Sequence, residues 1–281
     1  MKGRLVHLPG LGVSLFVRTS GSGHPLLLMH GGPGVDHSTM LPFLPCADEF
    51  QLLFYDHRCN GRSVGADVQT MTWENLAADA EALRESLGIE RWAILGHSFG
   101  GMVALEYAIR FPERLSHLCV LDSGGDAKMV QQGASLVLGQ RGFSNREVAT
   151  AQRFFTGQIG HGELLKSMIT LGRAYYSKPG PFFLLVEALH GLRIRSNPAA
   201  FIFGFSKLLP GWSVMQQLAC IKAPTLILAG RDDFQFPPEH QKLLAEGIPN
   251  AQLRIVDRAG HNAHFERPKE VLEIVRQFLR S

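Results

Sequence analysis

The sequence predicts an α/β fold in which helices cover both faces of a mostly parallel central sheet and one block of helices is inserted. Two observations lead to this prediction. Short apolar runs alternate with helical patterns along most of the chain, and this order builds a parallel sheet beneath two layers of helices. The alternation stops between residues 125 and 215, where only helical patterns follow one another. We expect residues 1–124 and 216–281 to form the core domain and residues 125–215 to form a helical cap.

The composition is typical of a single globular domain with an insertion. The chain has 281 residues, of which 45% are hydrophobic, so it can bury a large core. It begins without the apolar stretch of a signal peptide and has no run of about 18 apolar residues, so we expect a cytoplasmic protein without membrane attachment. The net charge of +3, without a basic run, predicts no nucleic-acid partner. Four well-separated cysteines indicate reduced thiols.

Strand and turn signals account for the first part of the chain. Residues 3–18 are typical of a hairpin that turns at LPGLG, and PLLLMHG (25–31) and QLLFYDHR (51–58) are typical of buried strands. A helix is expected over about 72–87, with Thr72 as its N-cap. These elements begin the sheet and supply its first covering helix.

The later part repeats the alternation of strand and helix around the insertion. SHLCVLDS, APTLILAG and AQLRIVD are expected to be strands, and helices are expected to begin near Pro237 and Pro268. The helical patterns of the insertion are NREVATAQRFF, GELLKSMITLGRAYY and PFFLLVEALHGL. An insertion between two strands would lie over their carboxyl ends, where open α/β sheets bind ligands.

The stretch AILGHSFGGMVAL (93–105) changes from a strand into a helix around Ser98. A chain that reverses within about two residues forces the residue at the apex into a sparsely populated backbone region. Gly96 and Gly100 relieve the crowding, because they have no side chain. The pattern Gly-x-Ser-x-Gly between a strand and a helix is typical of a nucleophile elbow, which presents the serine hydroxyl at the start of the helix. Ser98 is therefore the candidate nucleophile.

A serine nucleophile needs a base that takes its proton and a carboxylate that orients the base. In VDRAGHNAHFERP, His261 is the candidate base and His264 is the alternative. In LILAGRDDFQFPP, Asp233 is the candidate acid and Asp232 is the nearest alternative. Asp122 is a third choice, and its other interpretation is a turn cap. The order serine, aspartate, histidine along the chain is the one expected of a nucleophile elbow.

The segment HGGPG (30–34) follows a strand and offers backbone N–H groups that no side chain covers. Such donors are needed where negative charge forms on a substrate carbonyl oxygen. We expect the N–H groups of Gly32 and of Phe99, the residue after the nucleophile, to form this oxyanion hole. The other interpretation of HGGPG is an ordinary turn.

Five motifs together resemble the α/β-hydrolase superfamily: HGGPG, DHRCNGRS (56–63), GHSFGG, GRDDFQFP and AGHNAHFERP. The first two are similar to motifs of its proline iminopeptidase branch. The resemblance covers essentially the whole chain outside the insertion. It implies a helical cap after the strand that follows the elbow helix. It also implies these roles: Ser98 as nucleophile, Asp233 as acid, His261 as base, and the backbone of Gly32 and Phe99 as oxyanion hole.

The chain also departs from that branch. DHRCNGRS stands where the branch has D-Q-R-G-x-G-x-S, so His57 replaces Gln and Cys59 replaces Gly. Asp56 and Arg58 of this motif are expected to hold the loop. Phe99 stands where the branch usually has Trp. These departures weaken the peptidase interpretation and leave the serine mechanism intact.

The composition of the insertion indicates the kind of substrate. Aminopeptidases of the resembled kind hold the substrate's ammonium group with cap carboxylates, yet residues 125–215 contain ten Lys and Arg against four acidic residues. Glu163 and Glu187 keep the peptidase interpretation open. Eleven of the chain's 25 aromatic residues lie in the insertion, and those that face the cleft would suit an apolar acyl or aryl group.

We therefore expect a serine hydrolase that cleaves neutral, moderately hydrophobic carboxylic esters through an acyl-enzyme, without a metal or organic cofactor. Its expected partner is a small-molecule ester or amide. The alternative is a proline iminopeptidase-like aminopeptidase or amidase, followed by a hydrolase of lactones or of carbon–carbon bonds. A protein that only binds small molecules is the remaining alternative, although binding alone does not need a nucleophile, base, acid and oxyanion hole together.

Overall fold

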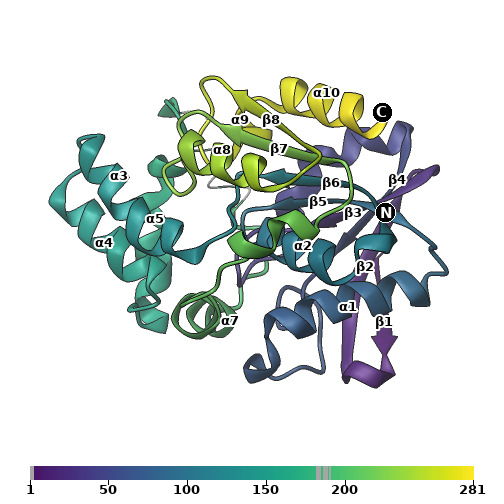
Figure 1. The fold of residues 1–281 in the computed structure, drawn as a ribbon. Coiled ribbons are helices and arrows are strands. Elements are labelled where there is room, and N and C mark those ends of the chain that lie inside the picture. Colours follow the sequence, from purple (N-terminus) through teal and green to yellow (C-terminus); the bar gives the residue numbers. More distant parts are fainter. Residues whose placement is uncertain (1–2, 182–184, 186–188, 190) are drawn as a thin grey trace.

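The structure is a computed structural model that describes residues 3–181, 185, 189 and 191–281. Its centre is an eight-stranded sheet in the order β1, β2, β4, β3, β5, β6, β7, β8 (Figure 1). The predicted N-terminal hairpin is present, and every neighbouring pair from β4 to β8 is parallel. The predicted α/β class with a mostly parallel sheet is thereby confirmed. The strands are β1 (Gly3–Leu8), β2 (Val13–Ser20), β3 (His24–Met29), β4 (Phe50–Tyr55), β5 (Trp92–His97), β6 (Leu115–Leu121), β7 (Thr225–Gly230) and β8 (Ala251–Val256).

Successive residues of the parallel strands enter two different apolar layers, because side chains alternate between the faces of a sheet. Ile94 of β5 belongs to one layer and its neighbour Leu95 belongs to the other. The first layer is covered by α1 (Trp73–Ser86), α2 (Phe99–Arg110) and α8 (Pro238–Gly247). The second is covered by the 3-10 helical segment His37–Asp48, α9 (Ala263–Glu266) and α10 (Pro268–Leu279). Both faces of the sheet are therefore buried, as predicted.

The ends of α1 show how local sequence places an element. The Thr72 hydroxyl accepts a hydrogen bond from the N–H of Asn75 at 3.2 Å and so caps the first turn. Beyond the other end, Gly88 has a φ of +67°, which glycine adopts without strain. The observed helix lies within the predicted range of 72–87.

Between β6 and β7 the described residues form helices and no strand. Figure 1 shows these helices gathered beside the sheet. The helix expected over PFFLLVEALHGL lies largely outside the described residues, and so do Phe182, Phe183 and Glu187. No helix in the described part of the chain is long and apolar enough to span a membrane. The helices of the insertion are α3 (Ala134–Gln140), α4 (Asn145–Phe155), α5 (Leu164–Leu171) and α7 (Pro198–Phe203), with π-helical turns at Met129–Gly133 and Gly204–Leu208.

Candidate active site

β5 and α2 meet at Ser98 in the sharp reversal that the sequence predicts. Ser98 has φ +51° and ψ −121°, a conformation that costs a non-glycine residue about 1–3 kcal/mol. A Cβ on Gly96 would collide with the carbonyl group of Gly100, and a Cβ on Gly100 would collide with the carbonyl of Met29. Only glycine fits at both positions, so the motif and the backbone shape depend on each other.

Ser98 begins a line of hydrogen bonds that ends on a buried carboxylate. Its Oγ lies 2.9 Å from Nε2 of His261, and Nδ1 of His261 lies 2.9 Å from Oδ2 of Asp233. The N–H groups of Gln235 and Phe236 donate to the other oxygen of Asp233 at 2.8 and 3.2 Å. Ser98, His261 and Asp233 are 8%, 2% and 0% exposed. The fold thus brings together three residues that follow the carboxyl ends of β5, β7 and β8.

Two of the alternative residues have partners outside this line. Asp232 accepts a hydrogen bond from the hydroxyl of Ser177 at 2.5 Å. Nε2 of His264 lies 3.1 Å from the carbonyl oxygen of Thr39 and therefore donates to it. Both ring nitrogens of His261 face Asp233 and Ser98, so the geometry selects Asp233 and His261 from each pair.

Asp122 joins two loops instead of orienting a histidine. Its Oδ1 accepts from the N–H of Gly230 at 2.7 Å, and its Oδ2 accepts from the N–H of Ala263 at 3.1 Å. Complete burial raises the pKa of the Asp122 carboxyl well above its ordinary value, and the charge of Asp233 raises it further. The two donors lie 108 and 141 residues away in the chain, so these contacts are not those of a cap on a neighbouring turn. They link the loops that carry Asp233 and His261.

The HGGPG loop passes directly beside the nucleophile. A Cβ placed on Gly31 would lie 3.4 Å from the Cβ of Ser98, so the backbone of Gly31 lies close to the serine. The carbonyl group of Gly34 accepts from the N–H of Asn197 in the insertion at 2.8 Å. Phe99 is the first residue of α2, and the first N–H groups of a helix have no partner within the helix. The HGGPG loop and the first turn of α2 therefore both lie next to Ser98.

The segment 56–63 holds the neighbouring loops through buried polar contacts. Arg58 donates two hydrogen bonds to Asp79, at 2.5 and 2.6 Å, and the two side chains are only 3% and 2% exposed. Asp56 accepts from the N–H groups of His37 at 2.8 Å and Arg62 at 2.7 Å. Asp56 and Arg58 thus make the loop-holding contacts expected of them.

Aromatic rings surround the histidine of the site. Tyr175, from the insertion, lies edge-on to His261 with 5.6 Å between ring centroids, and Phe236 lies 5.9 Å from it. Tyr175 also contacts Phe234 at 5.4 Å, and Phe234 contacts Phe155 of α4 at 5.7 Å. A continuous aromatic cluster therefore connects the insertion with the imidazole.

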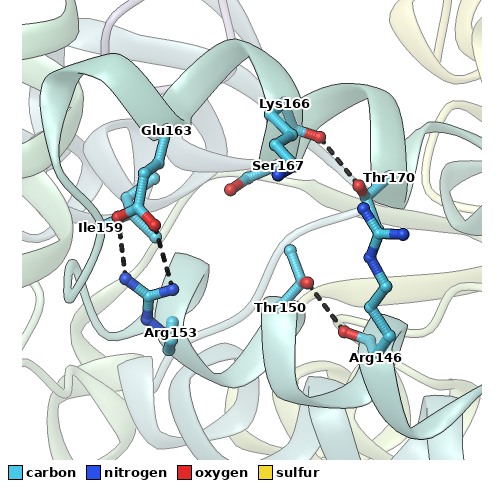
Figure 2. Close-up of a pocket in the computed structure, with 8 residues that line it drawn as sticks. All are labelled: Arg146, Thr150, Arg153, Ile159, Glu163, Lys166, Ser167 and Thr170. Atoms are coloured by element: carbon cyan, nitrogen blue, oxygen red, sulfur yellow. Dashed lines mark hydrogen bonds and ion pairs between the residues drawn. The ribbon is translucent and has the colours of Figure 1, made fainter.

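A polar cavity of about 200 Å³ lies between α4 and α5, apart from this site (Figure 2). Arg153 and Glu163 face each other at its wall, with N–O distances of 2.8 and 3.2 Å. The hydroxyls of Thr150 and Thr170 donate to carbonyl groups of their own helices. Glu163 is thus paired with an arginine of the insertion. The lining residues are Arg146, Thr150, Arg153, Ile159, Glu163, Lys166, Ser167 and Thr170.

The other acidic residues of the insertion are also engaged where the structure describes them. Glu147 accepts two hydrogen bonds from Arg173, at 2.8 and 3.1 Å. That ion pair and the Ser144 hydroxyl lower the pKa of Glu147 to about 2. Asp126 accepts from the N–H of Lys128 at 2.7 Å. Each described carboxylate therefore has a partner within the insertion itself.

Two groups of described residues contain side chains of the kind that bind metals. One is Asp36 with His37 and Asp56, and the other is His97 with Asp122 and His264. Every carboxylate oxygen in these groups already accepts a hydrogen bond from the protein. Hydrogen bonding accounts for both groups, and we assign no metal to them.

Sequence reasoning misses two residues that tie the insertion to the catalytic loops. Glu266 accepts from the N–H of Gly260, beside His261, and from the N–H of Ser177 in the insertion, at 2.5 and 2.9 Å. Arg141 reaches from the end of α3 to the carbonyl oxygen of Asp233 at 3.2 Å. The only signal for Glu266 is its place in AGHNAHFERP, and Arg141 has none, because its partner lies 92 residues away in the chain.

Comparisons with known proteins agree with this fold. Residues 24–268 match the family profile described as alpha/beta hydrolase fold. The chain is 29% identical over 288 positions to a protein named proline iminopeptidase from Saccharolobus solfataricus, covering 93% of this chain and 86% of that one. It is 27% identical over 275 positions to a 2-hydroxy-6-oxo-6-phenylhexa-2,4-dienoate hydrolase from Comamonas testosteroni, covering 93% and 89%. The crystal structure of proline iminopeptidase from Mycobacterium smegmatis has the same fold, with a TM-score of 0.79, 24% identity and coverage of 99% and 98%. The resemblance predicted from the motifs is confirmed.

Proposed function

The chain belongs to the α/β-hydrolase fold family, and we propose that it is a serine hydrolase that cleaves carboxylic esters of small molecules. The observation that carries the proposal is the line of hydrogen bonds from Ser98 through His261 to Asp233. In this proposal Ser98 is the nucleophile, His261 the base and Asp233 the acid. Residues 125–215 act as a cap over the core domain formed by residues 1–124 and 216–281.

The partners of His261 determine where its proton lies. The Asp233 carboxylate only accepts hydrogen bonds, so Nδ1 of His261 carries a proton and Nε2 offers its lone pair to Ser98. His261 takes the proton of Ser98 as the serine oxygen attacks the substrate carbonyl, and it gives that proton to the leaving group. The same imidazole then activates the water that releases the acyl group. Asp233 stabilises the positive charge on the ring at both stages.

The N–H groups of Gly32 and Phe99 are the proposed donors to the oxyanion. Gly32 follows Gly31, whose backbone lies close to Ser98, and Phe99 opens α2, where the helix dipole adds positive potential. One well-aimed donor of this kind contributes roughly 3–4 kcal/mol to transition-state stabilisation. The donors act on charge that develops only during the reaction, so they raise kcat.

The surroundings of the triad support an ester in preference to a substrate with a free amino group. Tyr175 and Phe236 offer apolar surface beside His261, which suits an acyl or aryl group. A substrate ammonium group would need a carboxylate near it, but Glu163 and Glu147 are paired with arginines of the insertion. An aminopeptidase is the second candidate, because a relative is named proline iminopeptidase.

A substrate comparison tests the choice between these activities. We would measure kcat/KM for p-nitrophenyl esters of increasing acyl length, for proline p-nitroanilide and for p-nitroacetanilide, which has the same leaving group but no free amine. The proposal predicts efficient ester turnover and no preference for the free amine between the two anilides. A strong preference for proline p-nitroanilide would instead identify an aminopeptidase. The control is Ser98→Ala, and a folded variant that kept most of the activity would exclude Ser98 as the nucleophile.

A further inference from the structure

Behind the HGGPG loop, three buried side chains take part in two lines of hydrogen bonds that meet at His30. The hydroxyl of Tyr55 lies 2.8 Å from Nδ1 of His57, and Nε2 of His57 lies 3.3 Å from the carbonyl oxygen of His30. The backbone N–H of His57 donates to Nε2 of His30 at 3.2 Å, and Nδ1 of His30 lies 2.7 Å from the carbonyl oxygen of Gly31. Tyr55, His57 and His30 are at most 1% exposed. These two lines are together called the loop relay below. The first runs from Tyr55 through the His57 ring to the His30 carbonyl, and the second runs from the His57 N–H through the His30 ring to the Gly31 carbonyl.

The partners determine the tautomers of both imidazoles. Nε2 of His30 accepts from an amide, so the proton of His30 lies on Nδ1, which donates to the Gly31 carbonyl. Nε2 of His57 faces a carbonyl oxygen and must donate, so Nδ1 of His57 accepts from the Tyr55 hydroxyl. Burial lowers the pKa of both His30 and His57, which keeps the rings neutral. Every donor of the loop relay therefore has one acceptor. The first line ends on the His30 carbonyl and the second ends on the Gly31 carbonyl.

The second line of the loop relay ends on the peptide group that supplies a proposed oxyanion donor. The carbonyl of Gly31 and the N–H of Gly32 belong to the same peptide, and in a trans peptide these two groups point in opposite directions. A hydrogen bond that holds the carbonyl therefore also sets the direction of the N–H. It also polarises the amide, because hydrogen bonds in series strengthen one another. Glycine on each side leaves the peptide little other resistance to rotation.

We infer that Tyr55 and His57 are positioning residues. The His57 ring, oriented by Tyr55, holds the His30 carbonyl, and the fixed His30 aims the N–H of Gly32 at the oxyanion through the bond from its own ring to the Gly31 carbonyl. The inference rests on the proposed function, because it gives the Gly32 N–H its role in the reaction. His57 stands where the resembled branch has Gln. The two side chains are chemically equivalent here, since a glutamine amide can accept from Tyr55 and donate to the His30 carbonyl.

Three variants test the loop relay: His57→Leu removes both ring contacts, His57→Gln restores them, and Tyr55→Phe removes one oxygen atom. For each we would measure kcat and KM for a p-nitrophenyl ester, the inhibition constant of an aryl trifluoromethyl ketone, and the Tm. The ketone forms an adduct with an oxyanion, so its affinity reports on the hole. Full loss of one donor costs about 100- to 1000-fold in kcat, and for a misaimed donor we expect roughly 10- to 100-fold in His57→Leu.

The expected pattern separates positioning from a merely structural role. In His57→Leu, kcat and the affinity for the ketone fall by the same factor, KM changes less than about twofold, and titrated active sites stay intact. His57→Gln recovers kcat to within about threefold of wild type, and Tyr55→Phe lies between. A kcat loss that matches only a loss of titratable sites, or an unchanged ketone affinity, overturns the inference.

The failure of the inference and the failure of the proposed function give different results in these measurements. If His57→Leu does not fold, Tyr55→Phe decides, and wild-type kcat and ketone affinity in that variant overturn the inference. If the wild-type protein turns over no ester and does not bind the ketone, the proposed function fails and the inference falls with it. Wild-type ester turnover with no response in any of the three variants overturns the loop relay alone.

Discussion

Two ion pairs show how differently the strand-end loops and the insertion carry charge. Arg58 and Asp79, which hold the loop after β4, are 3% and 2% exposed and bond in two places. Arg153 and Glu163 of the insertion also bond in two places, but they are 51% and 48% exposed. A buried charge without its partner is costly, whereas water screens an exposed pair. The buried pair at the strand ends is therefore tightly constrained, while this exposed pair of the insertion is not.

The same contrast holds for the groups that would do chemistry. Around the triad, the loop relay and Asp122, polar atoms are buried and hydrogen-bonded, and the bonds cross between loops that follow different strands. The insertion places the ring of Tyr175 beside His261, and its polar side chains bond to the surrounding loops, as Arg141 does to the carbonyl oxygen of Asp233. The strand ends are suited to determine the reaction, and the insertion is suited to determine the substrate.

The largest expected effect lies within the strand-end region. Asp233→Asn replaces the carboxylate beside Nδ1 of His261 by an amide. The amide favours the histidine tautomer that cannot take the proton of Ser98, so we expect kcat to fall by about 10⁴. Asp232→Asn is the matched control, because Asp232 bonds to Ser177 and not to His261. Steady-state ester kinetics on both variants measure the difference. Equal losses in the two variants would show that the geometry of the triad does not decide which aspartate acts.

The next effect compares the two ion pairs directly. Arg58→Ala leaves Asp79 buried without its cation, so we expect the free energy of unfolding to fall by about 3–5 kcal/mol. Arg153→Ala removes the same kind of side chain from an exposed pair, and its unfolding curve should overlie that of the wild type. Urea unfolding gives both values. If Arg153→Ala destabilised the protein as much as Arg58→Ala, the contrast between the two regions would be wrong.

The smallest effect is a pH dependence at His57. Burial lowers the pKa of His57 in the folded protein, and a histidine in the unfolded chain has a pKa of about 6.5. As the pH falls below this value, the unfolded chain takes up a proton that the folded protein does not, so the wild type loses stability. The unfolded His57→Gln variant does not take up this proton, because glutamine has no imidazole. Its stability relative to wild type should therefore rise by up to about 1.4 kcal/mol per pH unit between pH 6 and 5.

Urea unfolding of wild type and His57→Gln at pH 7, 6 and 5 provides the measurement. The difference between the two proteins removes the contributions of the other titrating groups that they share. Parallel stability curves across this range would mean that His57 is protonated equally in both states.

Local signals in the sequence predict much of this molecule. The hairpin at LPGLG, the helix capped by Thr72 and the elbow at Ser98 depend on backbone preferences within a few residues, and all three are present. The loop relay is not predictable in this way. Tyr55 and His57 are two residues apart, but the group they act on is near residue 30, and only the parallel pairing of β3 with β4 brings those residues together.

By itself, the sequence determined the class of fold, the nucleophile elbow and a short set of candidates for base and acid. Glycine spacing, capping residues and apolar periodicity act over one or two turns of chain, so they can be read without the fold. Tertiary structure alone decided that Asp233 faces His261 while its neighbour Asp232 faces Ser177. It also placed Asp122 between two loops and paired Glu163 with Arg153. These choices depend on hydrogen bonds between distant segments, and strand order and loop packing set which of those bonds can form.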